Sequence, residues 1–242
     1  TIFYRRGIYY MILTLDVENT VTKRNNKLML DPFEPDNSLV MIGLLEGSEH
    51  ENIITFDHSE QQPTTGGWQI VQDALNKTPL LIMHNAAYDL MWLWESGFTY
   101  RGEVFDTMLG EYILQRGQKL PLTLEACAKR YELDTLKQDT LKEYFKKGYS
   151  TRDIPHDELS TYLSADLHAT YELFRKLEGK YNDKDSSLQS TIKLTNDIAV
   201  QLARIYQRGF KVDLKVLDEV RIEFEKEKLQ LTNDLQKQVR FL

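Results

Sequence analysis

The feature that most constrains the fold is an apolar stretch, residues 11–18, which carries two carboxylates at its end. Its composition favours a β-strand, and side chains two apart on a strand point to the same face. Asp16 and Glu18 would therefore stand side by side, which is unfavourable unless a cation lies between them. A strand that simply ends in a polar loop explains the same residues, so further ligands must come from elsewhere in the chain.

Composition predicts a soluble globular protein with one large domain and an appendage. The chain has 242 residues, of which 41% are hydrophobic and 28% charged. No apolar run reaches the ~18–20 residues that span a bilayer, so no membrane partner is expected. The single cysteine excludes an internal disulfide and favours a reducing compartment. Cys127 lies on the apolar side of a predicted helix, residues 124–133, which indicates a core position.

The net charge of −7 argues against indiscriminate nucleic-acid binding, but the charge is unevenly spread. Residues 115–152 contain nine basic and five acidic residues, a net charge of +4, which leaves −11 for the remainder. A local basic surface beside a carboxylate-rich centre suits a groove that holds a nucleic-acid backbone. A solvated helical face explains the same residues.

Periodicity predicts an α/β chain. The first ten residues belong either to the first strand or to an upstream extension. Residues 23–37 are rich in Lys, Asn, Asp and Pro and predict a loop. Strands are expected at residues 38–45, 52–56 and 80–83, the first two pairing with residues 11–18 as an antiparallel meander, and a short helix at 68–76.

Two further acidic residues follow predicted strands. Asn85 is a good N-cap for a helix in which Asp89 occupies the first turns. Open α/β sheets gather functional side chains at this edge, although the helix dipole alone would also favour Asp89. Asp106 precedes another helix, and we interpret it as a structural N-cap rather than a catalytic residue.

A long helix is predicted after Pro155. Tyr162 and Asp166 share one of its faces, and an Asp on the apolar side of a helix is costly unless it has a partner. Residues 179–187 form the best domain boundary. Another helix, residues 188–208, is expected to end at Gly209, and Asp213 is expected to cap the last helix.

Three segments together resemble a known family. Residues 15–18, 84–89 and 162–166 are similar to the three motifs of the four-carboxylate (DEDD) 3′–5′ exonucleases, in the same order. The spacing of Tyr162 and Asp166 is that of the tyrosine branch. The histidine branch would need a His where Thr161 stands. The resemblance covers residues 11–178 and implies a ribonuclease H-like exonuclease domain at 1–178, with a mixed sheet flanked by helices and followed by long C-terminal helices.

A second resemblance narrows the family. Residues 202–213, with a turn from Gly209 to Asp213, resemble a segment of family A DNA polymerases of the DNA polymerase I type, including phage enzymes. In that family the segment connects the proofreading domain to the polymerase domain. The resemblance implies that residues 179–242 are a linker and the start of the thumb helices. The missing polymerase domain of the same polypeptide would be a partner. Proofreading in DNA replication, in the cytoplasm of a bacterial or phage-infected cell, is the function implied.

The resemblance also implies a mechanism. Asp16, Glu18, Asp89 and Asp166 would hold two divalent ions, Mg²⁺ or Mn²⁺, about 3.5–4 Å apart, for hydrolysis at a single-stranded or frayed DNA 3′ end. Tyr162 would orient the attacking water and Glu18 the 3′-hydroxyl. Asn85 and Asn19 would contact substrate. Asn19 departs from the family, which has Thr at this position, so the terminal base could be held differently.

Two rival functions remain open from the sequence. A stand-alone exoribonuclease of the ribonuclease D type would use the same chemistry on RNA. The segment from Gly209 to Asp213 and the long helix after it count against this alternative. A catalytically silent nucleic-acid-binding or scaffold domain is the second rival, and the complete set of acidic ligands disfavours it.

Overall fold

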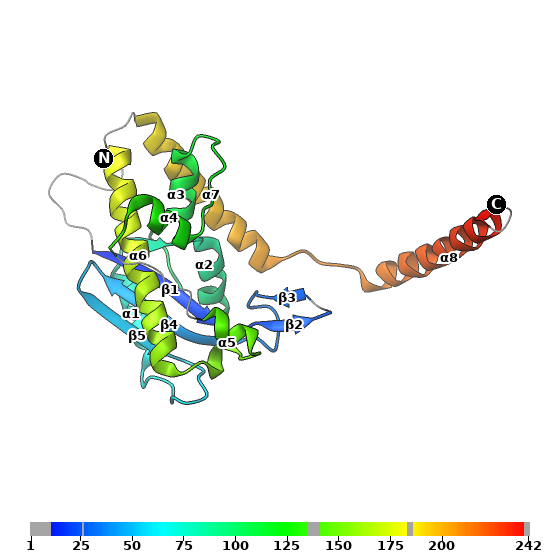
Figure 1. Cartoon of the computed structure of the whole chain (residues 1–242), viewed down its shortest axis with the longest axis horizontal. Helices are drawn as coiled ribbons and strands as arrows, with labels where there is room; N and C mark the ends of the chain where they lie inside the picture. Colours follow the sequence, from blue (N-terminus) through cyan, green and yellow to red (C-terminus); the bar gives the residue numbers. More distant parts are fainter. Residues whose placement is uncertain (1–10, 26, 135–140, 183–185, 240–242) are drawn as a thin grey trace. The chain divides into compact units, whose positions relative to one another are not determined.

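The computed structural model describes residues 11–25, 27–134, 141–182 and 186–239 (Figure 1). The chain divides into two units between Gln207 and Arg208, and each is described by itself. The first ten residues, with their two open interpretations, lie outside the described ranges. So does Lys137 of the basic stretch.

The first unit is built on a mixed five-stranded sheet. In spatial order its strands are β5 (His50–Thr55), β4 (Leu39–Glu46), β1 (Ile12–Asn19), β6 (Leu80–Met83) and β7 (Glu103–Asp106). β1, β4 and β5 form the antiparallel meander expected from the sequence, whereas β6 and β7 run parallel to β1. The predicted α/β class with a mixed sheet is confirmed.

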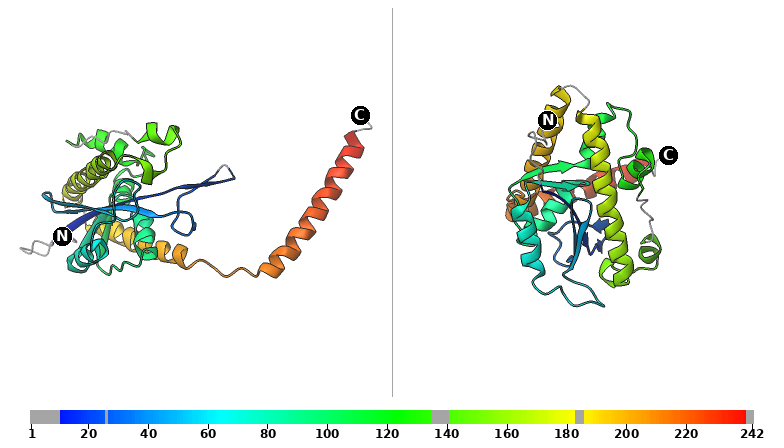
Figure 2. Two further views of the ribbon diagram at one scale, coloured as in Figure 1. Left: turned by 90° about the horizontal axis from the view of Figure 1, so that it is seen from below. Right: turned by 90° about the vertical axis from the view of Figure 1, so that its left-hand side faces the viewer.

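Helices cover both faces of this sheet (Figure 2). They are α1 (Gly67–Lys77), α2 (Ala86–Glu95), α3 (Thr107–Leu114), α4 (Leu124–Tyr131), α5 (Lys142–Lys146), the 3-10 turn η1 (Thr151–Asp153), α6 (His156–Asn182) and α7 (Ser186–Arg208). Leu13 and Leu15 of β1 pack in a core with α1 and α2. α6 lies on the opposite face, where its residues share further cores with β4, β6, α4 and α7. Cys127 is fully buried in one of these cores, as predicted.

A glycine allows α6 to approach the sheet closely. Gly43 of β4 is paired with Asp16 of β1. A Cβ atom at Gly43 would lie only 2.6 Å from Cδ1 of Leu167 and 3.0 Å from Cγ of Leu163, both on α6. Since any larger side chain would push the helix away, Gly43 fixes the distance between α6 and the carboxylate end of β1.

The prediction of a loop at residues 23–37 was wrong in its first part. A two-stranded hairpin, β2 (Thr22–Arg24) and β3 (Lys27–Met29), follows β1 directly. Its strands have three residues each and are mostly polar, so they show no apolar alternation that would have revealed them.

The C-terminal helices behave differently from each other. α7 belongs to the first unit, since Ile192 is buried in a core with α6 and Ala203 is also buried. The second unit contains α8 (Leu214–Val239), in which no residue is buried. As expected, Gly209 has a positive φ of 61° and the Asp213 side chain accepts hydrogen bonds from the first backbone N–H groups of α8. Among the described residues, no helix has the length and apolarity needed to cross a bilayer.

Candidate active site

The carboxylate end of β1 presents two acidic side chains to α6. Leu13, Leu15 and Val17 point into the core with α1 and α2, so the alternate residues Asp16 and Glu18 face the other way. Both are half-buried. The pairing of β1 with β4 becomes irregular between Glu18 and Asn19, where the strand leaves the sheet. The two carboxylates therefore stand at the point where regular pairing ends.

Asp166 reaches the same place from α6. Its side chain is buried, and carboxylate oxygens of Asp16, Glu18 and Asp166 lie within 4.8 Å of one another. The sequence predicted that these residues, about 150 positions apart, meet. The structure brings them together because α6 crosses the sheet at Gly43.

Asp89 completes the group from α2. It is buried in the first turn of the helix and accepts a hydrogen bond from the backbone N–H of Val17. Burial, followed by the negative charge of Asp16 and then that of Asp106, raises the pKa of Asp89 well above its usual value. The charge of Glu18 acts in the same direction. Asp16 and Glu18 thus have acidic neighbours on two helices, Asp89 on α2 and Asp166 on α6.

A fifth carboxylate, Asp106, positions α2. Asn85 occupies the N-cap position, but its exposed side chain makes no capping hydrogen bond and its backbone is left-handed, with φ of 72°. Asp106 accepts hydrogen bonds instead, from Asn85 N at 3.1 Å and Ala86 N at 2.9 Å. The same side chain caps α3 through Met108 N. Asp106 is therefore the structural cap that the sequence predicted, and it serves two helices rather than one.

Tyr162 lies one helical turn before Asp166 on α6. It is half-buried and packs against an apolar core that includes Met41, Leu141 and Leu163. The residue thus adjoins the carboxylate group on the same helix, and packing restricts its ring.

Asn19 is more deeply engaged than the sequence suggested. Its side chain is buried, its Nδ2 donates to the backbone oxygen of Thr20 at 2.8 Å, and its Oδ1 accepts from the hydroxyl of Tyr88 at 2.7 Å. Sequence reasoning gave Tyr88 no role, although it directly precedes Asp89. Burial raises the pKa of Tyr88 to about 12, so it remains a neutral donor at physiological pH. The hydrogen bond from Tyr88 to Asn19 therefore connects α2, which carries Asp89, to the end of β1.

The donor set fits hard divalent cations. It consists of carboxylate oxygens alone, which suit Mg²⁺ and Mn²⁺ rather than the softer metals that select sulfur or imidazole. The crowding that raises the pKa of Asp89 is the repulsion that a bound cation would relieve. Asp16, Glu18 and Asp166 offer the closest oxygens, with Asp89 behind them.

At least four of the nine basic residues in the stretch 115–152 form ion pairs within the protein. Arg130 forms an ion pair with Glu111, Arg152 with Asp57 and Lys146 with Glu143. Lys129 pairs with Glu125. Glu125 and Glu143 belong to the stretch and are already counted in its net charge of +4, so of these four pairs only those of Arg130 and Arg152 involve acidic residues from outside it.

Comparison with known proteins defines the class. A family model described as 3′-5′ exonuclease matches residues 30–182, which include Asp89, Tyr162 and Asp166. Because the match covers more than half of the chain, the protein belongs to this 3′–5′ exonuclease family, and its fold is the ribonuclease H-like fold that the sequence predicted. The matched range begins after Asp16 and Glu18.

The sequence is also similar to that of a curated enzyme. It is 30% identical over 196 residues to DNA polymerase I of Synechocystis, a match that covers 78% of this chain. The chain is a 3′–5′ exonuclease domain related to that of DNA polymerase I. It spans only about a fifth (19%) of the length of this curated relative.

Solved structures share the fold at low sequence identity. NrnC of Brucella melitensis with bound Mg²⁺ superimposes with a TM-score of 0.58 at 16% identity, over 84% of this chain and 89% of NrnC. The POL domain of Pol1 from M. smegmatis, in complex with DNA primer-template and dNTP, gives a TM-score of 0.59 at 18% identity. That match covers 88% of this chain and 31% of Pol1.

Proposed function

We propose that this chain hydrolyses the 3′-terminal phosphodiester of DNA with divalent metal ions and releases nucleoside monophosphates. The observation that carries the proposal is the convergence of Asp16, Glu18 and Asp166, with Asp89 beside them. Membership of a 3′–5′ exonuclease family supports the direction of attack.

Each residue has a role in this proposal. Asp16, Glu18, Asp89 and Asp166 hold the cations, which, when bound, lower the pKa of water and stabilise a leaving 3′-oxygen. Glu18 also accepts a hydrogen bond from the substrate's 3′-hydroxyl. The Tyr162 hydroxyl orients the attacking water. The exposed side chain of Asn85 contacts the terminal nucleotide, whereas Asn19 acts through its contact with Tyr88.

The biological setting we propose is proofreading within a family A DNA polymerase, in the cytoplasm of a bacterial or phage-infected cell. The identity to DNA polymerase I supports it. Residues 1–178 would be the exonuclease domain, and residues 179–242 a linker and the first thumb helices, although α7 packs with the first unit, which extends to Gln207. The helix α8, capped by Asp213, is compatible with that assignment. The substrate end must be single-stranded, since frayed bases cost less to unstack than paired ones.

Digestion of matched substrates tests the proposal. A DNA primer with a mismatched 3′ end, the same primer fully paired and an RNA oligomer of the same sequence would each be incubated with Mg²⁺ or with EDTA. We expect the mismatched primer to be shortened fastest, with release of nucleoside monophosphates, and EDTA to stop the reaction. Asp16→Asn protein, prepared in parallel, controls for contaminating nucleases.

One alternative, a stand-alone nuclease, has an observation in its favour. The likeness to NrnC covers most of that protein, whereas the likeness to the curated DNA polymerase I covers a small part of it. A preference for the RNA oligomer over both DNA primers would support a ribonuclease of the same chemistry. Tight binding of either substrate without digestion would support a silent binding domain and refute the enzymatic proposal.

A further inference from the structure

The hairpin β2–β3 is built onto the candidate active site. It starts three residues after Asn19, and the backbone oxygen of Leu30, just beyond β3, lies 2.9 Å from the hydroxyl of Tyr88. That hydroxyl also contacts Asn19. Both ends of the hairpin therefore meet at the residue that precedes Asp89.

Further contacts hold the base of the hairpin. Asn37 donates from Nδ2 to the backbone oxygens of Met29 and Asp31, and its Oδ1 accepts from the Thr22 hydroxyl. Arg24 forms an ion pair with the buried Glu34 at 2.7 Å. An isolated two-stranded hairpin is marginal in water, so these anchors explain why such short strands persist.

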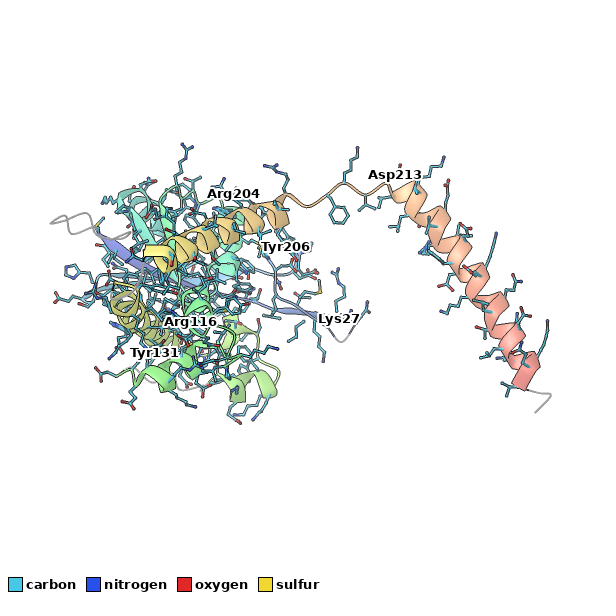
Figure 3. All side chains as sticks on the ribbon, turned by 90° about the horizontal axis from the view of Figure 1, so that it is seen from above. Lys27, Arg116, Tyr131, Arg204, Tyr206 and Asp213 are labelled. Carbon is cyan, nitrogen blue, oxygen red and sulfur yellow. The ribbon has the colours of Figure 1, made fainter. Side chains whose placement is uncertain are left out.

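One face of the hairpin combines a cation with apolar side chains. Lys23 and Leu28 are directly paired across the two strands, so they share a face. Leu30 is two residues beyond Leu28. Leu28 is 64% exposed and Leu30 46%, and Lys23 is exposed as well. Lys23, Leu28 and Leu30 together form the hairpin face, and Figure 3 shows Lys27 at the outer end of the projecting hairpin.

The positive charge of the hairpin segment, residues 19–30, favours a nucleic acid as its ligand. Residues 19–30 contain three basic residues and no acidic one. Arg24 is paired with Glu34, so Lys23 and Lys27 supply the positive charge near the carboxylates of Asp16, Glu18 and Asp166. Exposed leucines beside lysines offer apolar contact to bases and positive charge to phosphates, which single-strand binding surfaces combine. The whole chain has a net charge of −7, so this local positive charge is not a consequence of overall composition.

We propose that the hairpin face binds the nucleic-acid single strand a few nucleotides upstream of the 3′ end in the active site. The inference rests on the proposed function and adds a substrate-holding surface to it. Bases pack on Leu28 and Leu30 while Lys23 neutralises a phosphate, and Lys27 at the outer end of the hairpin adds positive charge nearby. The contacts of the Tyr88 hydroxyl with Leu30 and Asn19 fix the position of this surface relative to the carboxylates.

Substrate length separates the hairpin from the catalytic group. A DNA oligomer of about 12 nucleotides is long enough to reach the hairpin, whereas a dinucleotide fills only the active site. For the double variant Leu28→Ala/Leu30→Ala, we expect the KM of the oligomer to rise about five- to tenfold, with kcat and all dinucleotide parameters unchanged. Lys23→Gln should raise the same KM by about two- to threefold and reduce its salt dependence.

Matched controls come from other elements of the unit. Leu194 of α7 is 60% exposed, and Lys77 is an exposed lysine at the end of α1. Leu194→Ala and Lys77→Gln should leave both substrates unaffected. An unchanged oligomer KM in the hairpin variants would overturn the inference, whether or not their oligomeric state changes. An equal rise in the KM of the dinucleotide would also overturn it.

Binding without turnover keeps this inference separate from the proposed function. If the wild-type chain digests neither substrate with Mg²⁺, the proposed function fails. Fluorescence anisotropy of a labelled 12-nucleotide strand in EDTA then still tests the hairpin. Weaker binding by the hairpin variants than by the two controls supports the inference, and equal binding overturns it.

Discussion

Two groups of buried carboxylates lie within the first unit, and they differ in what surrounds them. Asp106 accepts hydrogen bonds from backbone N–H groups at the starts of α2 and α3. Glu111 is paired with Arg130 and accepts from the hydroxyl of Tyr131. In contrast, carboxylate oxygens of Asp16, Glu18 and Asp166 lie within 4.8 Å of one another, and the charges of Asp16 and Glu18 help to raise the pKa of Asp89.

The contrast indicates which acids stabilise the fold and which serve its chemistry. Burial of a carboxylate is costly unless donors surround it, so Asp106 and Glu111 have the partners expected of structural groups. A cluster of carboxylates raises the free energy of the metal-free fold and favours cation binding. The two groups therefore differ in their acidic neighbours: backbone N–H groups and Arg130 hold Asp106 and Glu111, whereas the acids at the end of β1 lie close to one another.

The largest effect should follow from Asp166→Asn. We expect digestion to fall by at least about a thousandfold, since a ligand is lost, while the metal-free protein keeps or gains stability because repulsion is relieved. Product release and thermal unfolding in EDTA are the two measurements. Asp157 on the same helix has a fully exposed side chain, and Asp157→Asn should change neither. Near-normal digestion by Asp166→Asn would refute the assignment.

The opposite pattern is expected at Glu111. Glu111→Gln leaves the guanidinium of Arg130 without its partner, and because that side chain is 24% exposed we expect a loss of about 2–3 kcal/mol in the free energy of unfolding. Activity per folded molecule should be retained. Urea unfolding checks this, with Glu125→Gln as control, since the exposed pair with Lys129 should contribute less than about 0.5 kcal/mol. Loss of activity in the folded variant would contradict the division between the two groups.

A smaller change is expected for Tyr162→Phe. Loss of the hydroxyl should slow cleavage about ten- to a hundredfold, because the attacking water is less well oriented. The Mg²⁺ concentration for half-maximal rate should not change, since Tyr162 is not a metal ligand in this proposal. Tyr112→Phe, at an exposed tyrosine of α3, is the control. A large shift in the Mg²⁺ requirement would count against the role assigned to Tyr162.

The smallest effect concerns pH and metal together. Because the pKa of Asp89 is raised in the fold, the metal-free folded protein retains a proton that the unfolded chain releases near pH 4. Stability should therefore fall as the pH rises from about 4 through the raised pKa. Bound Mg²⁺ offsets this repulsion, so its effect on Tm should be larger at pH 8 than at pH 5.

Thermal unfolding of Asp89→Asn sharpens this measurement. The variant lacks the titrating group, so in EDTA its Tm should depend less on pH than that of the wild type. If the wild-type Tm in EDTA instead rises between pH 5 and pH 8, the raised pKa of Asp89 does not govern stability in this range.

Much of the fold could be predicted because its determinants are local. The apolar run of β1, the Asp213 cap and the spacing of Tyr162 and Asp166 each depend on residues within one or two turns or strands. The hairpin β2–β3 could not, since its polar three-residue strands are held by contacts to Tyr88, Glu34 and Asn37 rather than by their own pattern.

The sequence by itself determined the class of fold, strands of the main sheet, the caps Asp106 and Asp213, and the acidic residues expected to meet. Only the tertiary structure decided the partners of those residues. The Asp106 side chain, from β7, accepts a hydrogen bond from the first N–H of α2, and the Asn19 side chain accepts one from the Tyr88 hydroxyl. Gly43 sets the distance from α6 to Asp16. The physical reason is that periodicity and capping act over a few residues, whereas the satisfaction of a buried polar group depends on whichever distant donor the packed fold brings within about 3 Å.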